Sequence, residues 1–551
     1  MSLREIIPLK TSLQFVLTLP GSKSITNRAF LCAALAEGTS RIYGALESDD
    51  TKVMLEALKK LGISIKKQKK GVEIAGCGGR FDLKPVMIDV GASGTTTRFL
   101  TALSILKRGK ITIKGTKRMM ERPMEDLYDA LEQYKSGRNV IRVRADKSSQ
   151  FLSALLMVAP LIGPLRIEVA GKLVSRPYID TTLAVMKAFG IQVKNNDYQS
   201  FETEKQSYKG IDYQVEGDAS AASYFLALEF LHGGKVRFEN LDLRRSIQGD
   251  AKFRGALAQL KKFPSRVIDM EDMPDVALTL ACIAPFISGQ TKITGLSTLR
   301  LKETDRLTAL ETELKKLGVR VRKAKDSLTV SGKPLKGARI ATYDDHRMAM
   351  SFAVMGTKSP GVVIEDPGCT SKTYPGFWRD LERMYISPLK LGRKNLLLTG
   401  MRCSGKTRHG KKIARRLKRK FVDLDREIEK RNKMKIDKIV KRFGWLYFRN
   451  LEQEICSLFS GAENLVIATG GGVVLSPENM KVLKKNSVNI FIYVDPEILY
   501  ERLSKDGVRP SLTGRKSEEE IHDIWEERRG LYLKYADYVW DNSGANPFEG
   551  I

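Results

Sequence analysis

The sequence LAVMKAFGIQV at residues 183–193 has a close counterpart in LEALKKLGISI at residues 55–65, and LETELKKLGVRV at residues 310–321 is a third copy with one extra residue. The three copies share a glycine at equal intervals along the chain, at Gly62, Gly190 and Gly318. Apolar residues at helical spacing precede each glycine and alternating residues follow it, which predicts a helix that ends at the glycine and a strand after it. Three copies indicate a scaffold of repeated α/β units.

The repeat pattern stops after Tyr385. Weaker copies of it lie at residues 127–135 and 257–267. The stretch that follows Tyr385, ISPLKLGR, contains a proline and a glycine and precedes a new apolar run, NLLLT. Because proline and glycine interrupt regular structure, we interpret this stretch as a linker. We therefore predict an N-terminal region of residues 1–385, a linker of residues 386–393 and a C-terminal domain of residues 394–551.

The composition is that of a globular protein with a large excess of basic residues. The 551-residue chain has 94 lysines and arginines against 64 aspartates and glutamates, a formal net charge of +30. Such a charge suits nucleic acid, an acidic membrane surface or small anionic substrates, and does not by itself choose between them. The excess is spread over the whole chain, and we interpret its densest run, KKIARRLKRK at residues 411–420, as the solvent-facing side of a helix.

Several kinds of site and location are disfavoured by the sequence. The six cysteines include no CxxC pair and the four histidines no pair at metal-ligand spacing, which argues against a zinc site or a disulfide framework. The longest charge-free apolar stretch, residues 148–165, is interrupted by prolines and polar residues, and the first ten residues lack the apolar core of a secretory signal. We therefore expect a cytoplasmic protein without a membrane segment.

A glycine-rich motif opens the C-terminal domain. The sequence GMRCSGKT at residues 400–407 follows the apolar run NLLLT and precedes a helical pattern, which is the context of a phosphate-binding loop. In such a loop, backbone N–H groups and a helix N-terminus hold phosphates, the lysine reaches the β and γ oxygens, and the threonine hydroxyl suits Mg²⁺. The ATP-binding residues predicted here are Gly400, Gly405, Lys406 and Thr407.

Further features of this domain narrow the kind of kinase. It contains an Asp-x-Asp pair after apolar residues, a Phe-Arg pair followed by a glutamate, a glycine run after an apolar strand, an Arg-Pro pair in a polar stretch and a Glu-Arg pair before a tyrosine. These are Asp423 and Asp425, Phe448-Arg449 with Glu452, Gly470 to Gly472, Arg509-Pro510, and Glu527-Arg528 with Tyr532. In this arrangement they resemble the shikimate kinase family, and the resemblance covers residues 394–545.

The resemblance implies a role for each of these residues. Asp425 would hold the shikimate hydroxyls and take the proton of the attacking one, and Asp423 with Thr407 would support the Mg²⁺ that accompanies ATP. Two arginines would clamp the shikimate carboxylate in bidentate geometry. The implied shikimate contacts are Asp425, Arg449, Gly470, Gly471, Gly472 and Arg528. Arg509 would close over the ATP phosphates and Arg502 would stack near the adenine.

Motifs rich in cations, hydroxyls and carboxylates are scattered through the N-terminal region. PGSKSITNR at residues 20–28 brings two cations and several hydroxyls to the start of a helix, which is a natural anion pocket. The others are GASGTTTR at 91–98, ERP at 121–123, SSQ at 148–150, SRPY at 175–178, EGDAS at 216–220, PD at 274–275, LKETDR at 301–306, DDHRMAM at 344–350 and CTSKTYP at 369–375. Spread over separate repeats, they predict a cleft that gathers an anionic, highly oxygenated substrate.

In this order and spacing the motifs resemble the EPSP synthase family (5-enolpyruvylshikimate-3-phosphate synthases) over residues 5–385. The resemblance implies an α/β fold of two lobes, each a threefold arrangement of βαβαββ units, which the repeat favours independently. Lobe one would combine residues 1–20 with 215–385, and lobe two would be residues 21–214. By its own resemblance, the C-terminal domain would be a P-loop kinase domain with a parallel sheet.

The implied reaction transfers the enolpyruvyl group of phosphoenolpyruvate (PEP) to shikimate 3-phosphate, and it needs an acid at C3 of PEP and a base for the attacking hydroxyl. Asp275 and Glu303 resemble these two carboxylates, with Lys23 assisting in proton handling, and the sequence leaves open which one is the acid. The implied shikimate 3-phosphate contacts are Lys23, Ser24, Arg28, Ser148, Ser149, Gln150, Ser175, Tyr178, Asp275 and Lys302. The implied PEP contacts are Lys23, Gly94, Arg122, Gln150, Arg306, Arg347 and Lys372.

The sequence departs from both families at a few positions. Cys403 stands where the kinases usually have glycine, and Ala92 and Thr298 stand where the synthases usually have asparagine. Residues 133–147 and 260–269 are shorter than in the synthases, as if repeat units had been trimmed. We expect lost helices there to weaken a lobe without removing the site.

We therefore predict a bifunctional enzyme of the shikimate pathway, in which the kinase makes the shikimate 3-phosphate that the synthase uses. The expected partners are the small molecules shikimate, ATP, PEP and shikimate 3-phosphate, with Mg²⁺ beside ATP in the kinase and no cofactor in the synthase. We expect no nucleic acid, no membrane and a monomer. Two alternatives stay open: only one of the two domains is active, or the chain is a basic nucleic-acid-binding protein with a P-loop ATPase.

Overall fold

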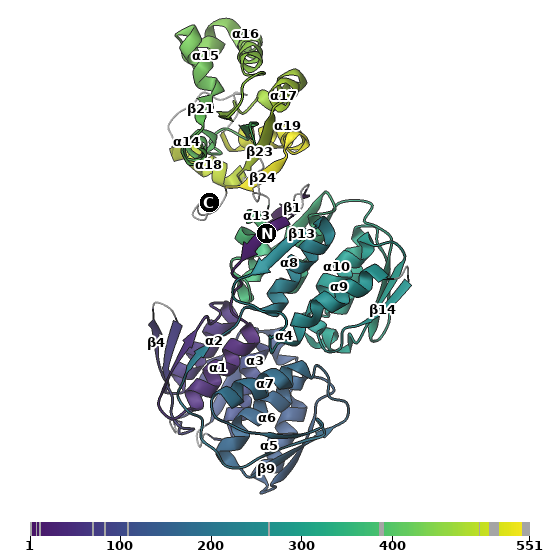
Figure 1. The fold of residues 1–551 in the computed structure, drawn as a ribbon. Helices are drawn as coiled ribbons and strands as arrows, with labels where there is room; N and C mark the ends of the chain where they lie inside the picture. The colour runs from purple at the N-terminus through teal and green to yellow at the C-terminus, as the bar shows by residue number, and fades with distance from the viewer. Residues whose placement is uncertain are drawn as a thin grey trace. The chain divides into compact units, whose positions relative to one another are not determined.

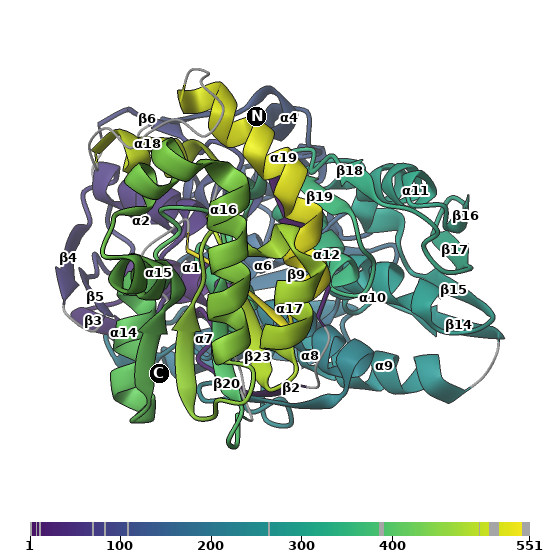
Figure 2. The same cartoon turned by 90° about the horizontal axis from the view of Figure 1, so that it is seen from above.

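The computed structural model describes residues 3–6, 8–9, 13–68, 71–81, 84–106, 110–262, 265–384, 391–494, 496–505 and 517–542. The chain divides into two compact units, of which the first is Met1–Pro8 with Ser12–Phe377 and the second is Leu9–Thr11 with Trp378–Ile551. Five residues of the predicted linker, 386–390, lie outside the described residues. Figures 1 and 2 show the ribbon from two directions.

Three four-stranded sheets of the first unit share one topology, in which a parallel pair of strands is followed by two antiparallel neighbours. In spatial order, their strands are β12 (Asp212–Gln214), β3 (Thr39–Tyr43), β5 (Gly71–Ala75) and β4 (Ser64–Gln68); β8 (Val140–Arg144), β9 (Leu165–Ala170), β11 (Ser200–Thr203) and β10 (Lys194–Asn196); and β14 (Ser265–Asp269), β15 (Gln290–Thr294), β17 (Ser327–Ser331) and β16 (Arg320–Lys323).

The repeated sequence motif occupies the same place in each of these sheets. It forms the helices α2 (Asp49–Lys60), α7 (Pro177–Ala188) and α11 (Arg306–Lys316), which connect β3 to β4, β9 to β10 and β15 to β16. The glycines that follow, Gly62, Gly190 and Gly318, have φ of 90°, 89° and 83°, a left-handed conformation that glycine adopts without a Cβ clash. The predicted helix, glycine stop and strand are confirmed, although β10 begins later after its glycine than β4 and β16 do.

Two further repeats are shortened. Strands β6 (Val86–Asp89) and β7 (Ile111–Lys114) form one parallel pair, and β2 (Leu13–Leu17) and β13 (Gly234–Phe238) form another. The helices that follow these pairs, α5 (Glu125–Lys135) and α9 (Phe253–Lys262), lead directly into β8 and β14.

The expectation that helices are lost at these two places is therefore wrong. Within the described residues, what is absent there is the strand hairpin that follows the helix in the other repeats. The physical reason is burial: α5 buries Leu127, Ala130 and Leu131 in the core, whereas a hairpin strand such as β4 is largely exposed. Losing a hairpin costs less apolar burial than losing a core helix.

The remaining elements of the first unit are a three-stranded sheet and a set of core helices. In spatial order, the strands of this sheet are β1 (Leu3–Ile6), β19 (Val362–Glu365) and β18 (Ala338–Ile340). The short helical elements are α4 (Lys117–Met120), η1 (Gly249–Lys252), η2 (Pro274–Val276), η3 (Ala284–Phe286), η4 (Ser297–Leu301) and η5 (Pro367–Lys372), and α13 (Phe377–Arg383) begins at the last residue of this unit and otherwise belongs to the second. The core helices are α1 (Lys23–Leu35), α3 (Gly94–Leu103), α6 (Ser149–Ile162), α8 (Ala219–His232), α10 (Ala277–Ile283) and α12 (His346–Gly356). They are buried on nearly all sides, as a helix without a polar face requires, and Figure 1 shows α1, α3, α6 and α7 gathered in one group and α8, α9 and α10 in another.

The second unit is built around a parallel five-stranded sheet. In spatial order, its strands are β21 (Lys420–Asp423), β22 (Leu465–Ala468), β20 (Asn395–Thr399), β23 (Ser487–Tyr493) and β24 (Tyr538–Asp541). Its helices, which Figure 2 shows in green and yellow, are α14 (Lys406–Leu417), α15 (Leu424–Asn432), α16 (Ile436–Leu458), α17 (Pro477–Lys484), α18 (Pro496–Lys505) and α19 (Ser517–Tyr535). The central strand β20 is completely buried, as the apolar run NLLLT predicts, and it leads into the glycine-rich loop and α14.

Candidate active sites

Five of the buried helices in the first unit begin at two neighbouring pockets. A helix N-terminus has unpaired N–H groups and a partial positive charge, so it favours anions. The residues at these helix starts that line the pockets are Lys23 and Ser24 on α1, Gly94 and Thr95 on α3, Ser148 to Gln150 on α6, Asp218 and Ser220 at α8, and Arg347 on α12. The fold therefore brings motifs that are hundreds of residues apart to one anion-binding region.

The carboxylate of Asp275 lines the larger pocket and is held by four donors. Its Oδ1 lies 3.3 Å from the ammonium of Lys302 and 3.1 Å from the guanidinium of Arg306. Its Oδ2 accepts hydrogen bonds from Arg347 at 3.1 Å and from the Tyr178 hydroxyl at 2.9 Å. Burial would raise the pKa of Asp275, but the three cations outweigh it and hold that pKa well below its usual value.

A second carboxylate, Glu303, lines the same pocket beside different cations. Its oxygens lie 2.9 Å from Arg306 and 3.3 Å from Lys372. Burial would raise the pKa of Glu303, but Lys372, Arg306 and Arg122 lower it well below its usual value. Arg306 is itself fixed by a 2.6 Å contact with the completely buried Asp345. The guanidinium of Arg306 therefore contacts both predicted catalytic carboxylates and is held in place by the buried Asp345.

Hydroxyl and amide groups occupy another part of the larger pocket. Ser148 caps α6 by accepting a hydrogen bond from the Gln150 backbone at 3.2 Å, and the Gln150 amide donates to Thr95 at 3.3 Å. Ser175 has φ of 54° and donates to a backbone carbonyl at 3.4 Å. The predicted shikimate 3-phosphate contacts that line this pocket are Lys23, Ser24, Ser148, Ser149, Gln150, Ser175, Tyr178, Asp275 and Lys302.

One predicted contact, Arg28, is placed elsewhere. Its guanidinium is 2% exposed, donates to Thr182 at 2.7 Å and to the Ser24 carbonyl at 2.9 Å, and is not part of the lining of either pocket. In the structure it ties α1 to α7, and it also donates to the Tyr178 carbonyl at 3.3 Å, so it supports two of the predicted contacts, Ser24 and Tyr178.

The predicted PEP contacts lie at the larger pocket, and two of them, Arg306 and Lys372, contact Glu303. Gly94, Arg122, Gln150, Arg306 and Arg347 line the larger pocket, and Lys372 reaches it through its ion pair with Glu303. A Cβ at Gly94 would lie 2.5 Å from a guanidinium nitrogen of Arg122, so only glycine lets the loop approach that arginine. At the two departures, Ala92 contributes its carbonyl, 3.4 Å from the Lys372 ammonium, and Thr298 lines the pocket.

Several residues at or beside these pockets are not among the predicted substrate contacts, and they include Asp50, Arg98, His346 and Asp250. Asp50 pairs with Lys23 at 3.1 Å, and Arg98 is buried four residues after Gly94 with its guanidinium donating to the Gly94 carbonyl at 2.9 Å. His346 is buried, and burial, followed by the charge of Lys23, lowers its pKa well below the usual value. Asp250 lines the smaller pocket. Helical spacing could have found Arg98, whereas Asp250 carries no local signal.

The phosphate-binding loop of the second unit has the expected strand, loop and helix. The ammonium of Lys406 donates to the carbonyls of Gly400 at 2.9 Å and Met401 at 2.7 Å, so the side chain folds back over the loop. Gly405 has φ of 93°, and Cys403 has φ of 60°, a left-handed conformation that glycine adopts at lower cost. The family's usual glycine at this position therefore has a steric reason.

The predicted metal and base residues lie next to this loop. The Thr407 hydroxyl donates to Asp423 at 2.6 Å, at the end of β21, and Asp423 caps α15. Two residues on, Asp425 is deeply buried, and this burial, followed by the charges of Asp423 and Glu452, raises its pKa to about 6, although Lys406 opposes the rise. Asp425 therefore titrates near neutral pH, as a general base should.

The glycine run, Gly470 to Gly472, packs closely against other predicted shikimate contacts. A Cβ at Gly470 would lie 2.7 Å from an Asp425 oxygen, and one at Gly472 would collide with the Arg449 guanidinium. The carbonyl of Gly471 accepts a hydrogen bond from Tyr532. The structure thus brings Asp425, Arg449 and the three glycines close to one another.

The two arginines predicted to clamp the shikimate carboxylate, Arg449 and Arg528, both lie near the buried acid Glu452. Arg449 pairs with Glu452 at 2.7 Å. The pKa of Glu452 is raised by burial, and the charges of Arg449 and Arg528 oppose the rise. Arg528, which is largely buried on α19, contacts Glu527 at 3.3 Å.

Two ATP contacts, Arg502 and Arg509, are predicted outside the loop, and the structure describes the first of them. Arg502 on α18 donates to the Asn542 carbonyl at 2.7 Å, and the Asn542 amide donates to the loop carbonyl of Ser404 at 2.9 Å. Arg502 is therefore connected to the phosphate-binding loop. Arg509 lies outside the described residues.

None of the helices described combines the length and the apolar character that crossing a bilayer requires. No cluster of three or more histidine, cysteine, aspartate or glutamate side chains in the described ranges is arranged to hold a metal ion.

Two protein families match different parts of this chain. The model of the EPSP synthase (3-phosphoshikimate 1-carboxyvinyltransferase) family matches residues 9–381, and that of the shikimate kinase family matches residues 402–550. The first match covers both pockets, and the second begins within the phosphate-binding loop, at residue 402.

Individual relatives agree with this division. The 3-phosphoshikimate 1-carboxyvinyltransferase of Hamiltonella defensa is 42% identical, over 66% of this chain and 94% of its own length. The pentafunctional AROM polypeptide 2 of Lodderomyces elongisporus is 33% identical over 95% of this chain, which spans 38% of that polypeptide. The solved EPSP synthase of Acinetobacter baumannii shares the fold of the first part, with a TM-score of 0.58, 23% identity and coverage of 70% of this chain and 98% of its own. The chain belongs to the EPSP synthase family and carries a shikimate kinase domain C-terminal to its synthase region.

Proposed function

We propose that this chain catalyses two consecutive steps, the ATP-dependent phosphorylation of shikimate at its 3-hydroxyl and the transfer of the enolpyruvyl group of PEP to the resulting shikimate 3-phosphate. The observation that carries the second step is the pair Asp275 and Glu303, joined by Arg306 and surrounded by separate sets of cations. The first step is carried by Asp425, buried beside the phosphate-binding loop.

The surroundings of the two synthase carboxylates support different roles. Asp275 contacts Tyr178 and Lys302, both expected at shikimate 3-phosphate, so we assign it as the base for the attacking hydroxyl. Glu303 contacts Arg306 and Lys372, both expected at PEP, so we assign it as the acid that protonates C3 of PEP. Binding of the PEP anion to these cations would raise the pKa of Glu303 by competing for them, which is what an acid requires.

In the kinase domain, ATP phosphates would lie on the loop N–H groups, with Lys406 moving from the loop carbonyls to the β and γ oxygens. The paired oxygens of Thr407 and Asp423 fit Mg²⁺, which prefers oxygen ligands and would neutralise charge on the transferring phosphoryl group. Asp425 accepts the proton of the shikimate hydroxyl. Arg449 and Arg528 hold the shikimate carboxylate, and the lid role of Arg509 stays a prediction.

The domain division is also part of this proposal. We place the synthase at residues 1–385 and the kinase at residues 394–551, and within the synthase we retain one lobe of residues 1–20 with 215–385 and another of residues 21–214. Pairing of β2 with β13 and of β1 with β19 supports the joining of the N-terminal residues to the later segment. A cytoplasmic location and a monomeric state stay predictions.

The test is to incubate the purified chain with shikimate, ATP, Mg²⁺ and PEP, and to follow shikimate 3-phosphate and its enolpyruvyl product separately by chromatography. Both products should form, the second only when PEP is present. A single product would favour the alternative of one active domain, which the strained Cys403 makes worth testing on the kinase side. Salt-dependent affinity for DNA or RNA with neither product formed would favour the nucleic-acid-binding alternative.

A further inference from the structure

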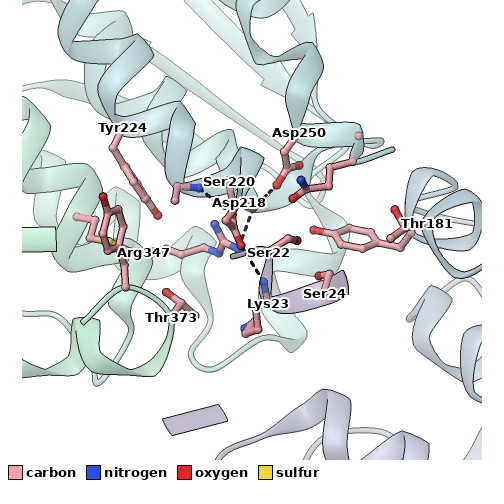
Figure 3. Close-up of a pocket in the computed structure, with 16 residues that line it drawn as sticks. Ser22, Lys23, Ser24, Thr181, Asp218, Ser220, Tyr224, Asp250, Arg347 and Thr373 are labelled. Carbon is pink, nitrogen blue, oxygen red and sulfur yellow. Dashed lines mark hydrogen bonds between the residues drawn. The ribbon is translucent and has the colours of Figure 1, made fainter. Parts of the chain in front are cut away.

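The smaller pocket of the first unit adjoins the larger one, and several of its lining residues, among them Asp218, Ser220, Tyr224 and Asp250, have no role in the proposed reaction. Figure 3 shows Asp218, Ser220 and Asp250 around it with Arg347. It shares Lys23, Ser24, Tyr178 and Arg347 with the larger pocket. Two of its lining groups, the Ser22 hydroxyl and the Tyr224 hydroxyl, are buried and have no hydrogen-bond partner among the described residues. Buried polar groups usually have a hydrogen-bond partner, so these two hydroxyls are available to a water molecule or a ligand in the pocket.

Asp250 is connected to the predicted base through a continuous chain of contacts. Ser220 donates its hydroxyl to Asp250, and the Nη2 atom of Arg347 lies 3.4 Å from that hydroxyl oxygen. The same nitrogen of Arg347 donates to Asp275 at 3.1 Å. One guanidinium nitrogen thus faces Asp275 on one side and the Ser220–Asp250 pair on the other.

The charged groups around Asp250 come from several elements. Asp218 is the N-cap of α8 and Tyr224 lies on that helix. Arg347 belongs to α12, Asp275 to η2, Tyr178 to α7 and Lys23 to α1. On the adjoining helix α9, Arg254 pairs with Glu229 at 3.4 Å instead. Asp250 therefore lies 5% exposed among two other carboxylates, with Arg347 as the cation nearest to it in the contact chain.

We propose that Asp250 is a positioning residue of the synthase reaction, which competes with Asp275 for Arg347 through Ser220 and thereby sets how basic Asp275 is. The inference rests on the proposed function, because it assigns Asp275 as the base. When Asp250 is protonated, the charge of Arg347 is available to Asp275 alone, which makes Asp275 a weak base. When Asp250 is ionised, Arg347 is shared, and Asp275 accepts a proton more readily.

The pKa of Asp250 lies near neutral pH, where a change in its charge can affect how basic Asp275 is. Burial, followed by repulsion from Asp275, raises its pKa to about 7, while Arg347 and the Ser220 hydrogen bond lower it. Ionisation should therefore occur near neutral pH. Because Arg347 is also a predicted PEP contact, the same step that strengthens the base should weaken the hold on PEP.

The experiment compares pH profiles of the wild type, Asp250→Asn, Ser220→Ala and the matched control Asp242→Asn, an exposed acid of the same unit. In the wild type, the synthase kcat and the KM for PEP should both rise through pH 7, each about three- to tenfold for a change of about one unit in the pKa of Asp275. Asp250→Asn should remove this step and keep the low-pH values throughout. Ser220→Ala should reduce the size of this step, because the contact through which Asp250 competes for Arg347 is lost. What remains of the step should move to higher pH, because the hydrogen bond that lowers the Asp250 pKa is lost as well.

A second readout does not depend on turnover. Infrared difference spectra between pH 6 and pH 8, recorded with every variant in an Asp425→Asn background so that the kinase carboxyl does not contribute, should show loss of a protonated carboxyl band in the otherwise wild-type chain and in Asp242→Asn, and no such band in Asp250→Asn. A wild-type band that survives in Asp250→Asn, or a kinetic profile of Asp250→Asn that overlays the wild type, overturns the inference. Absence of any enolpyruvyl product from the wild type, with the infrared band intact, would instead count against the proposed function.

Discussion

The hydroxyl of Tyr178 on α7 donates a 2.9 Å hydrogen bond to Asp275, a residue 97 positions later in the chain. Other contacts join the same two segments of the first unit: Lys172 lies 2.5 Å from Glu271, and Arg118 donates to the carbonyls of Arg300 and Lys302. The predicted base is therefore held by groups from both proposed lobes. Only when these segments meet is the set of donors around Asp275 complete.

Replacing Tyr178 by phenylalanine should impair the synthase selectively. Burial keeps the pKa of Tyr178 well above its usual value, so the hydroxyl stays protonated and acts as a donor. Loss of a hydrogen bond to a charged group costs about 1.5–3 kcal/mol, which corresponds to about 10- to 100-fold in kcat/KM for shikimate 3-phosphate. Steady-state kinetics with supplied shikimate 3-phosphate measures it. An equal loss of shikimate phosphorylation would mean that the variant is damaged globally.

Lys406→Ala should separate the two activities. The ammonium lies within the phosphate-binding loop, and its predicted task is to hold the β and γ phosphates, so phosphorylation of shikimate should fall to background. Synthase activity with supplied shikimate 3-phosphate should stay within a few-fold of normal, because no predicted synthase residue lies in this unit. Loss of both activities in a folded protein would contradict independent active sites.

The kinase reaction should depend on pH through Asp425. Because the pKa of this carboxyl is raised to about 6, its base form is populated above that value, and kcat/KM for shikimate should rise through pH 6 and then level off. Asp425→Asn should remove the step together with about 10²–10⁴-fold of the rate.

Stability provides an independent check on the same residue. A carboxyl whose pKa is raised on folding stabilises the domain at low pH, and this contribution is lost as pH rises from about 4 to about 6. Removing the charge in Asp425→Asn should therefore stabilise the kinase domain above pH 6 by up to about 3 kcal/mol and have little effect at pH 4. Thermal unfolding at the two pH values measures this, and a uniform effect would contradict the raised pKa.

Cys403→Gly should stabilise the kinase domain. Cys403 has φ of 60°, and a left-handed conformation costs a residue with a Cβ about 1–2 kcal/mol relative to glycine. The melting temperature should rise by a few degrees with ATP affinity retained. Cys403→Ala is the matched control, since alanine removes the thiol but keeps the Cβ. If both variants melt alike, the thiol and not the backbone governs stability here.

Local signals in the sequence were sufficient for the architecture. The repeat with Gly62, Gly190 and Gly318 predicted three helix–strand units, and GMRCSGKT after a buried strand predicted the phosphate-binding loop. These features are decided within about a dozen residues, by helical spacing, by the φ that glycine allows and by the buried strand before a loop. Motif order also predicted the two families and most of the residues that line the larger pocket.

What only the tertiary structure decided depends on contacts between distant segments. Arg28 donates to Thr182 instead of lining a pocket, the shortened repeats lose hairpins rather than helices, and Asp250 meets Ser220 and Arg347 behind the predicted base. No window of sequence contains both partners of such a contact, and the burial that moves a pKa belongs to the assembled core. The sequence thus determined which chemical groups this protein has, and the packing of its buried helices determined which of them face one another, because charge and hydrogen bonding act through space and not along the chain.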